Sequence, residues 1–305
     1  MMSKKLFELT LALLMLFSIP AALAEDTSVT VTDMLDREIT LAEPATRVVA
    51  LSAADCEIIC ALGCEEALVG RGKYCNYPES ILELPALQSG KDTNIEEILA
   101  LEPQIVIMSD MAQTEEQVKL LEDNGVQVVM TQNTDIEGAY YAITMIGALM
   151  GKDAEAEAIV EDMKATFEEI VQKSAENELT GKTVYFEVSP LEWGLYTAGT
   201  NTFMNVIAAM CGLTNAFADI DGWASISEEQ VLERNPDFIV SVAGMPEGDV
   251  EIMSRGGWAE VTAVKTGMVL NADADAFSRP GPRLKDAAVS LYNFINGIEE
   301  VPDAA

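Results

Sequence analysis

Two arginines near the C-terminal end are the first residues whose chemistry suggests a ligand site. Arg279 and Arg283 flank Pro280-Gly281-Pro282, in a chain that has only 18 basic residues against 51 acidic ones. The prolines fix φ and should make this loop rigid, and the sequence after it predicts an amphipathic helix with Arg283 in its first turn. Guanidinium groups held there can bind carboxylate, phosphate or amide groups of a ligand. A structural salt bridge to a nearby aspartate is the alternative interpretation.

Five aromatic side chains are expected in loops that follow strands or precede helices. Ligands of open parallel sheets bind at this edge, and rigid aromatic rings supply contact area at a low entropic cost. The candidate ligand-binding aromatics are Tyr74, Tyr77, Trp193, Tyr196 and Trp223. For any one of them, burial in the core of a lobe is the alternative.

The composition excludes several kinds of catalysis. Histidine is absent, which removes the commonest catalytic base and metal ligand, and with it serine–histidine triads and histidine zinc sites. We predict no catalytic residue, no metal site and no cofactor. Paired carboxylates can still do acid and base chemistry, so a surface hydrolase built on Asp110, Asp221 or Asp275 is the alternative from another functional class.

Most of the cysteines are expected to be small, buried apolar residues. The five cysteines are Cys56, Cys60, Cys64, Cys75 and Cys211. The first three share one face of a predicted helix, where sulfurs are poorly placed for bridging. A disulfide from Cys75 to one of them remains open for an exported protein.

A short internal repeat places one glutamate at the same position in each half of the chain. Residues 94–99 read Asn-Ile-Glu-Glu-Ile-Leu and residues 227–232 read Ser-Glu-Glu-Gln-Val-Leu, and both reach a proline at the same offset. Each copy predicts a capped helix, a proline break and a buried strand. Glu96 and Glu229 therefore occupy equivalent sites in first helical turns. Ordinary capping or dipole-favoured acids are the alternative interpretation.

The elements around these residues predict two α/β lobes. Residues 47–51 form a buried-strand pattern, Ser52 and Asp55 suggest a capping-box helix start, and strand–helix–strand order implies a parallel sheet. Residues 152–177 carry apolar side chains at helical spacing and predict one long helix between the lobes. The expected organisation is a signal peptide over 1–24, an N-terminal lobe over 25–150, a linking helix over 151–178 and a C-terminal lobe over 179–305.

The N-terminus predicts export. Lys4 and Lys5 precede an apolar run at 9–17 and small residues at 22–24, as in a secretory signal peptide cleaved before Glu25. A membrane anchor is the alternative, but the run is shorter than the ~20 residues that a bilayer requires. The formal net charge of −33 would repel nucleic acid. We expect an extracytoplasmic protein of the periplasm or cell surface with no nucleic-acid partner.

Taken in chain order, these segments resemble the substrate-binding proteins of ABC importers for cobalamin, ferric siderophores and haem. The resemblance rests on residues 47–52, 74–78, 94–103, 223–236 and 278–283. It implies the class III periplasmic-binding-protein fold, in which two Rossmann-like lobes are joined by one long helix and hold the ligand between them. It also implies that Glu96 and Glu229 dock onto arginines of an ABC transporter permease.

The resemblance further implies that the ligand is a metal chelate and that the protein, expected to be a monomer, is no enzyme. Tyr74 and Trp223 match aromatic positions of cobalamin binders, which favours cobalamin. A ferric siderophore is the alternative, because Arg279 and Arg283 could balance its negative charge. Haem is less favoured, since without histidine only a tyrosine could serve as the axial ligand.

Overall fold

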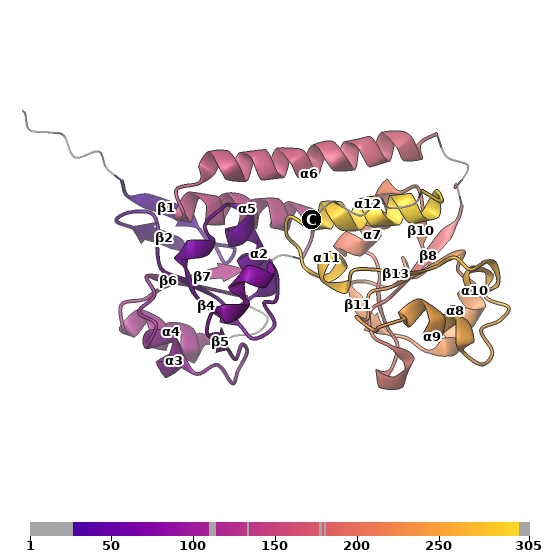
Figure 1. Ribbon diagram of the computed structural model, residues 1–305, viewed down its shortest axis with the longest axis horizontal. Coiled ribbons are helices and arrows are strands. Elements are labelled where there is room, and N and C mark those ends of the chain that lie inside the picture. Colours follow the sequence, from indigo (N-terminus) through magenta and orange to yellow (C-terminus); the bar gives the residue numbers. More distant parts are fainter. Residues whose placement is uncertain (1–26, 110–113, 133, 177–178, 180, 299–305) are drawn as a thin grey trace, which may run out of the picture.

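The structure, a computed structural model, describes residues 27–109, 114–132, 134–176, 179 and 181–298. Two α/β lobes lie side by side and helix α6 (Asp153–Ser174) runs along one side of both (Figure 1). This confirms the predicted fold class. The signal peptide predicted over 1–24 lies outside the described residues.

The N-terminal lobe is built on a parallel sheet with strand order β5-β4-β3-β6-β7. Its strands are β3 (Val48–Ala50), β4 (Leu68–Gly72), β5 (Ala86–Leu87), β6 (Ile105–Ser109) and β7 (Gln127–Thr131), preceded by the antiparallel pair β1 (Val29–Thr32) and β2 (Glu38–Leu41). Its helices are α2 (Ala53–Ala61), α3 (Ile95–Leu99), α4 (Glu115–Asp123) and α5 (Ile136–Leu149), with 3-10 turns at Glu65–Ala67 and Glu79–Glu83. Strands β3 and β6 are buried on both faces, as expected of a covered parallel sheet.

The C-terminal lobe repeats this plan with a parallel sheet of order β10-β8-β12-β13. Its strands are β8 (Thr183–Glu187), β10 (Thr214–Asn215), β12 (Phe238–Ser241) and β13 (Val269–Asn271), and β9 (Tyr196–Ala198) pairs antiparallel with β11 (Trp223–Ser225). Its helices are α7 (Phe203–Met210), α8 (Glu228–Arg234), α9 (Gly248–Ser254), α10 (Thr262–Thr266), α11 (Ala274–Ser278) and α12 (Leu284–Ile295), with a 3-10 turn at Leu191–Trp193.

Helix α6 is the long helix that the apolar spacing predicts. It ends at Ser174, a few residues before the expected end, and spans about 33 Å at 1.5 Å per residue. Its buried side chains, including Met163 and Phe167, join a single apolar cluster that contains residues of both lobes. Because α6 packs on α5 of one lobe and α12 of the other, it is part of a shared core as well as a connection.

Close packing between α5 and α6 depends on Gly147. A Cβ atom at Gly147 would lie 2.5 Å from Cβ of Ala156 and 3.2 Å from the carbonyl oxygen of Lys152. Alanine in a helix is normally better than glycine by about 0.5–1 kcal/mol. At Gly147 the cost of overpacking the contact between α5 and α6 should outweigh that gain in helix propensity.

We expect Gly147→Ala to lower the free energy of unfolding by about 1–3 kcal/mol, measured by urea denaturation. The matched double variant Gly147→Ala/Ala156→Gly removes the clashing methyl group. It should be more stable than the sum of the two single changes predicts. A single variant as stable as the wild-type protein would contradict this account of the helix contact.

All five cysteines are free thiols, and all but the half-buried Cys60 are buried. Burial raises the pKa of Cys60 and that of Cys211 to about 12. The prediction that the cysteines serve mainly as small buried residues is therefore confirmed. In the part of the chain that the structure describes, no helix is long and apolar enough to cross a membrane.

Candidate functional site

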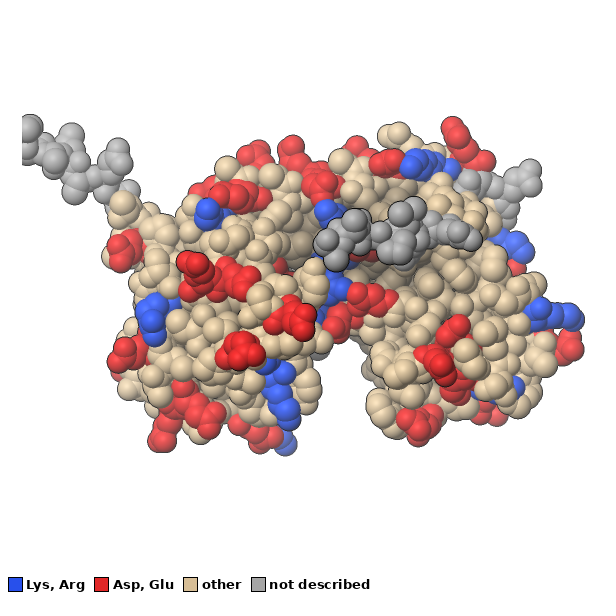
Figure 2. Space-filling view, in the orientation of Figure 1, with Lys and Arg blue, Asp and Glu red and all other residues tan. Residues whose placement is uncertain are grey.

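A hollow of about 240 Å³ lies between the two lobes. Its walls come from both of them: Ser52, Ala54, Ser109, Thr131 and Thr134 on one side, Phe203, Trp223, Ser278 and Pro280 on the other. The serines and threonines of the first lobe lie at or just after the ends of strands β3, β6 and β7. They are therefore at the carboxyl edge of the parallel sheet, where such sheets bind ligands. A notch between the lobes opens on the side opposite α6 (Figure 2).

The hollow combines hydroxyl groups with aromatic rings. Trp223 and Phe203 pack with ring centroids 5.6 Å apart. None of the described lining residues is charged, although acidic side chains are spread over both lobes (Figure 2). The site is therefore suited to a ligand that offers apolar surface together with neutral hydrogen-bonding groups.

Asp55 lies beneath this hollow, in the first turn of α2, and is fully buried. The Thr131 hydroxyl donates a 3.0 Å hydrogen bond to its Oδ2 atom, while Oδ1 has no partner among the described residues. Burial raises the pKa of Asp55 from 3.8 to about 7, although the hydroxyls of Thr131 and Ser52 lower it in part. Helix α2 starts where the sequence predicts, but the expected capping box is wrong, because Ser52 makes no side-chain cap hydrogen bond.

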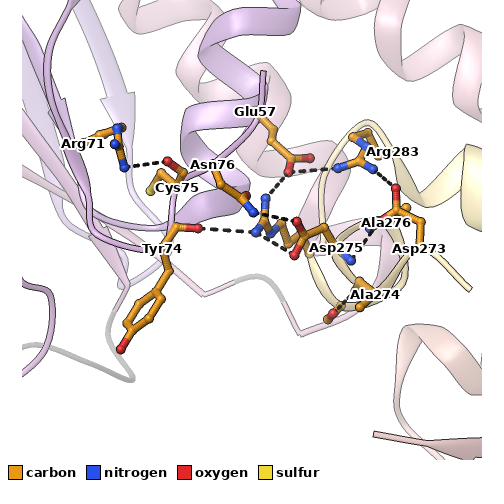
Figure 3. Close-up of polar contacts among 12 residues, drawn as sticks. Glu57, Arg71, Tyr74, Cys75, Asn76, Asp273, Ala274, Asp275, Ala276 and Arg283 are labelled. Atoms are coloured by element: carbon orange, nitrogen blue, oxygen red, sulfur yellow. Dashed lines mark hydrogen bonds and ion pairs between the residues drawn. The ribbon is translucent and has the colours of Figure 1, made fainter. Parts of the chain in front are cut away.

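A group of five charged residues joins the lobes beside the hollow, and we call it the interlobe charge cluster. Its members are Glu57, Asp273, Asp275, Arg279 and Arg283 (Figure 3). Glu57 Oε1 lies 2.7 Å from Nη1 of Arg279 and 3.4 Å from Nη1 of Arg283. Burial raises the pKa of Glu57, and the two arginines only partly oppose that rise.

Both predicted arginines are thus engaged with acids, as the salt-bridge alternative describes. Arg279 also pairs with Asp275 at 2.7 Å, and Arg283 pairs with Asp273. Neither arginine is among the residues that line the hollow, although the adjacent Ser278 and Pro280 are. A direct role for the arginines in ligand binding stays a prediction.

The interlobe charge cluster also positions the loop that carries two of the predicted aromatics. Arg279 donates to the backbone oxygen of Tyr74 at 3.3 Å, and the Asn76 side chain donates to Asp275 at 3.0 Å (Figure 3). The Arg283 guanidinium stacks 4.2 Å from the centroid of the Tyr77 ring. The loop from one lobe is therefore held by residues of the other.

The five predicted aromatics are all exposed, so the alternative of core burial is wrong for each of them. Trp223 lines the hollow. Tyr74 and Trp193 are 67% and 73% exposed, and Tyr77 and Tyr196 are also exposed. None of these four residues lines the hollow. The Tyr196 hydroxyl donates to the backbone oxygen of Trp223 at 3.2 Å, which links two of the predicted residues.

Glu96 and Glu229 lie exposed in the first turns of α3 and α8. These two helices belong to different lobes, and both lie on the side of the molecule away from α6 (Figure 1). The helix caps are made by other side chains, Asn94 in α3 and the Ser227–Gln230 box in α8. Neither glutamate is the capping residue, but both are acids in a first helical turn, as the dipole-favoured alternative describes. Docking stays a prediction.

Of the carboxylates considered for hydrolysis, the two that the structure describes, Asp221 and Asp275, have separate partners. Asp221 accepts a hydrogen bond from Asn201, Asp275 belongs to the interlobe charge cluster, and Asp110 lies outside the described residues. No group of three or more acidic or cysteine side chains within the described ranges could hold a metal ion. The residues that the sequence reasoning missed are Asp55, Glu57 and Phe203.

Two similar α/β lobes with a hollow between them define the class of two-lobed binding proteins. The chain belongs to the Periplasmic binding protein family, which matches residues 48–276. It is 31% identical to the uncharacterised ABC transporter substrate-binding lipoprotein YvrC of Bacillus subtilis, over 90% of this chain and 85% of the relative.

Other matches name ligands. The chain is 27% identical to the vitamin B12-binding protein of Salmonella typhi, over 83% of this chain and 91% of that one. Among solved structures, a possible iron-binding periplasmic solute-binding protein from Staphylococcus epidermidis superposes with a TM-score of 0.70 and 28% identity, over 83% of this chain and 99% of that chain.

Proposed function

We propose that this protein is the extracytoplasmic substrate-binding protein of an ABC importer and that its ligand is a corrinoid of the cobalamin type. Relatives that cover most of the chain include an ABC transporter substrate-binding lipoprotein and a vitamin B12-binding protein. A permease in the membrane is the partner that such a protein requires. The protein itself binds and delivers, and catalyses nothing.

The observation that carries the choice of ligand is that the described residues lining the hollow are uncharged. A corrin is flat and mostly neutral, and it carries carboxamide groups that can bond to the hydroxyls of Ser52, Ser109 and Thr131. Trp223 and Phe203 supply an aromatic wall for its apolar surface. A volume of about 240 Å³ is less than the ~300–1,000 Å³ of ordinary ligand pockets, so a corrin would extend beyond the hollow, toward exposed rings such as Tyr74.

A ferric siderophore remains the second candidate, favoured by the two arginines beside the hollow. Many such chelates are anionic and need free cationic groups in the site. Arg279 and Arg283 are already paired with three acids, which weakens this case. Haem is disfavoured for a chain that has no histidine.

Equilibrium binding of cyanocobalamin tests the proposal. We expect one corrinoid per chain, a dissociation constant of about 1 μM or tighter, and a change in tryptophan fluorescence on binding. Trp223→Ala should weaken binding about tenfold, because a tenfold loss corresponds to only about 1.4 kcal/mol of aromatic contact. Tyr141→Ala, which removes an exposed aromatic ring on α5, is the control and should bind normally.

Other chelates complete this experiment. Tight binding of a ferric siderophore with none of the corrinoid would replace the first candidate with the second. A protein that binds no corrinoid, ferric siderophore or haem would overturn the assignment to chelate transport.

A further inference from the structure

Glu57 places one buried carboxylate oxygen between two guanidinium groups. Its side chain is 2% exposed, and those of Arg279 and Arg283 are 12% and 14% exposed. Both arginines donate from Nη1 to the same oxygen, Oε1, from the opposite lobe. Figure 3 shows Arg283 and Glu57 at this point. Two cationic donors that converge on one point are the arrangement with which proteins bind carboxylate or phosphate groups of ligands.

This convergence point lies next to the ligand hollow along the chain. Arg279 is flanked by Ser278 and Pro280, and both of these residues line the hollow. The remaining acids of the interlobe charge cluster, Asp273 and Asp275, are 57% and 38% exposed, so their pairing with the arginines is screened by solvent. Glu57 is the acid that neutralises the arginines on their buried side.

We propose that Glu57 is a specificity-determining residue that occupies, from within the protein, the point where Arg279 and Arg283 would otherwise bind an anion, and so restricts the cleft to chelates without net negative charge. The inference rests on the proposed function, because it describes the ligand of the same site. Ligands that present carboxamide or hydroxyl groups are accepted, since they need no free cation.

The electrostatic reason is the position of the carboxylate. An anionic chelate in the hollow would approach a buried acid, and buried charges are little screened by salt. It would gain little attraction from the arginines, since Glu57 and the two aspartates already balance their positive charge. Removing the single charge of Glu57 should turn the same pair of guanidinium groups into an anion site without any new residue.

Glu57→Gln tests the inference, since glutamine keeps the shape of the side chain and removes its charge. Three probes are measured at constant ionic strength: cyanocobalamin, a neutral ferric trihydroxamate and a trianionic ferric tricatecholate. The wild-type protein should bind the neutral corrinoid and bind the tricatecholate at least about tenfold more weakly. In Glu57→Gln the affinity for the tricatecholate should rise at least about tenfold, which is 1.4 kcal/mol and lies below the usual coupling of close charge pairs.

Two further variants keep the test decisive. Asp275→Asn removes the charge of a more exposed partner of Arg279 and should give a smaller gain in affinity for the tricatecholate. This variant tests the inference if Glu57→Gln does not fold. Glu187→Gln is the matched control: Glu187 pairs with Arg255 at 2.7 Å, both side chains are at most 2% exposed, and neither lines the hollow. It should leave the affinity for the tricatecholate unchanged.

The outcomes separate the inference from the proposed function. If the wild-type protein binds none of the three chelates, the proposed function is overturned, and the role of Glu57 with it. If the wild-type protein binds the corrinoid but neither Glu57→Gln nor Asp275→Asn gains affinity for the tricatecholate, the role of Glu57 alone is overturned. The same holds if Glu187→Gln gains as much as Glu57→Gln, or if the wild-type protein binds the anion and the corrinoid equally well.

Discussion

Asp55→Asn should stabilise the fold at pH 8 by on the order of 4 kcal/mol and by less than about 1 kcal/mol at pH 4. The pKa of Asp55 is about 7 in the folded protein, against an ordinary value of 3.8, because the carboxyl group is fully buried. Below pH 3.8 both states are protonated and the group has no effect. Between pH 3.8 and 7 the unfolded chain loses the proton and the folded protein keeps it, so stability falls as the pH rises.

The size of the effect follows from the same rise in pKa. Each pKa unit corresponds to about 1.4 kcal/mol, so the rise from 3.8 to about 7 corresponds to about 4 kcal/mol above pH 7. Asparagine cannot ionise and avoids this cost. Urea denaturation at pH 4, 6 and 8 measures the difference in the free energy of unfolding between the variant and the wild-type protein. Asp36→Asn, at an exposed position, is the control for losing one negative charge. A variant less stable than the wild-type protein at pH 8 would mean that the ionised carboxylate is stabilised in the fold.

The cost of burying Asp55 supports a role for it in the candidate site. Residues that destabilise a fold are often retained at functional sites, where perturbed pKa values also gather. Asp55 accepts a hydrogen bond from the Thr131 hydroxyl, and Thr131 lines the hollow. The carboxyl group is therefore placed to set the direction in which that hydroxyl donates.

Elements with local signals could be predicted from the sequence. The helix expected over 152–177 is found as α6, because its apolar spacing matches the face that packs on α5 and α12. The repeat correctly predicted the capped helices α3 and α8, since a capping side chain acts within a few residues of the helix start. Such signals depend on neighbouring residues only.

Contacts between distant residues could not be predicted in this way. Glu57 and Arg279 are 222 residues apart, and nothing around Glu57 distinguishes it from other acids on a helix. The sequence therefore predicts only that the arginines bind a ligand or pair with a nearby aspartate, and it does not indicate Glu57. The expected Ser52–Asp55 capping box failed for a related reason: tertiary burial of α2 directs the Asp55 carboxyl group to Thr131, which lies 76 residues away.

Replacing both Glu96 and Glu229 with alanine is expected to lower ligand uptake at least tenfold while the ligand dissociation constant changes less than about twofold. Both glutamates are exposed and neither lines the hollow, so ligand binding should not depend on them. The resemblance to importer binding proteins implies that each one pairs with a permease arginine, one pair per lobe. Losing two charge pairs from one interface slows encounter and removes orientation, and tenfold corresponds to only about 1.4 kcal/mol.

Uptake by cells that carry the transporter, together with capture of the purified permease, measures this effect. The matched control is Glu97→Ala/Glu233→Ala, which removes the same charge from exposed positions of the same two helices and should leave uptake unchanged. If the control variant loses as much uptake as Glu96→Ala/Glu229→Ala, general electrostatic attraction accounts for docking. If neither double variant loses uptake, the two glutamates have no docking role, and α3 and α8 do not meet the permease through them.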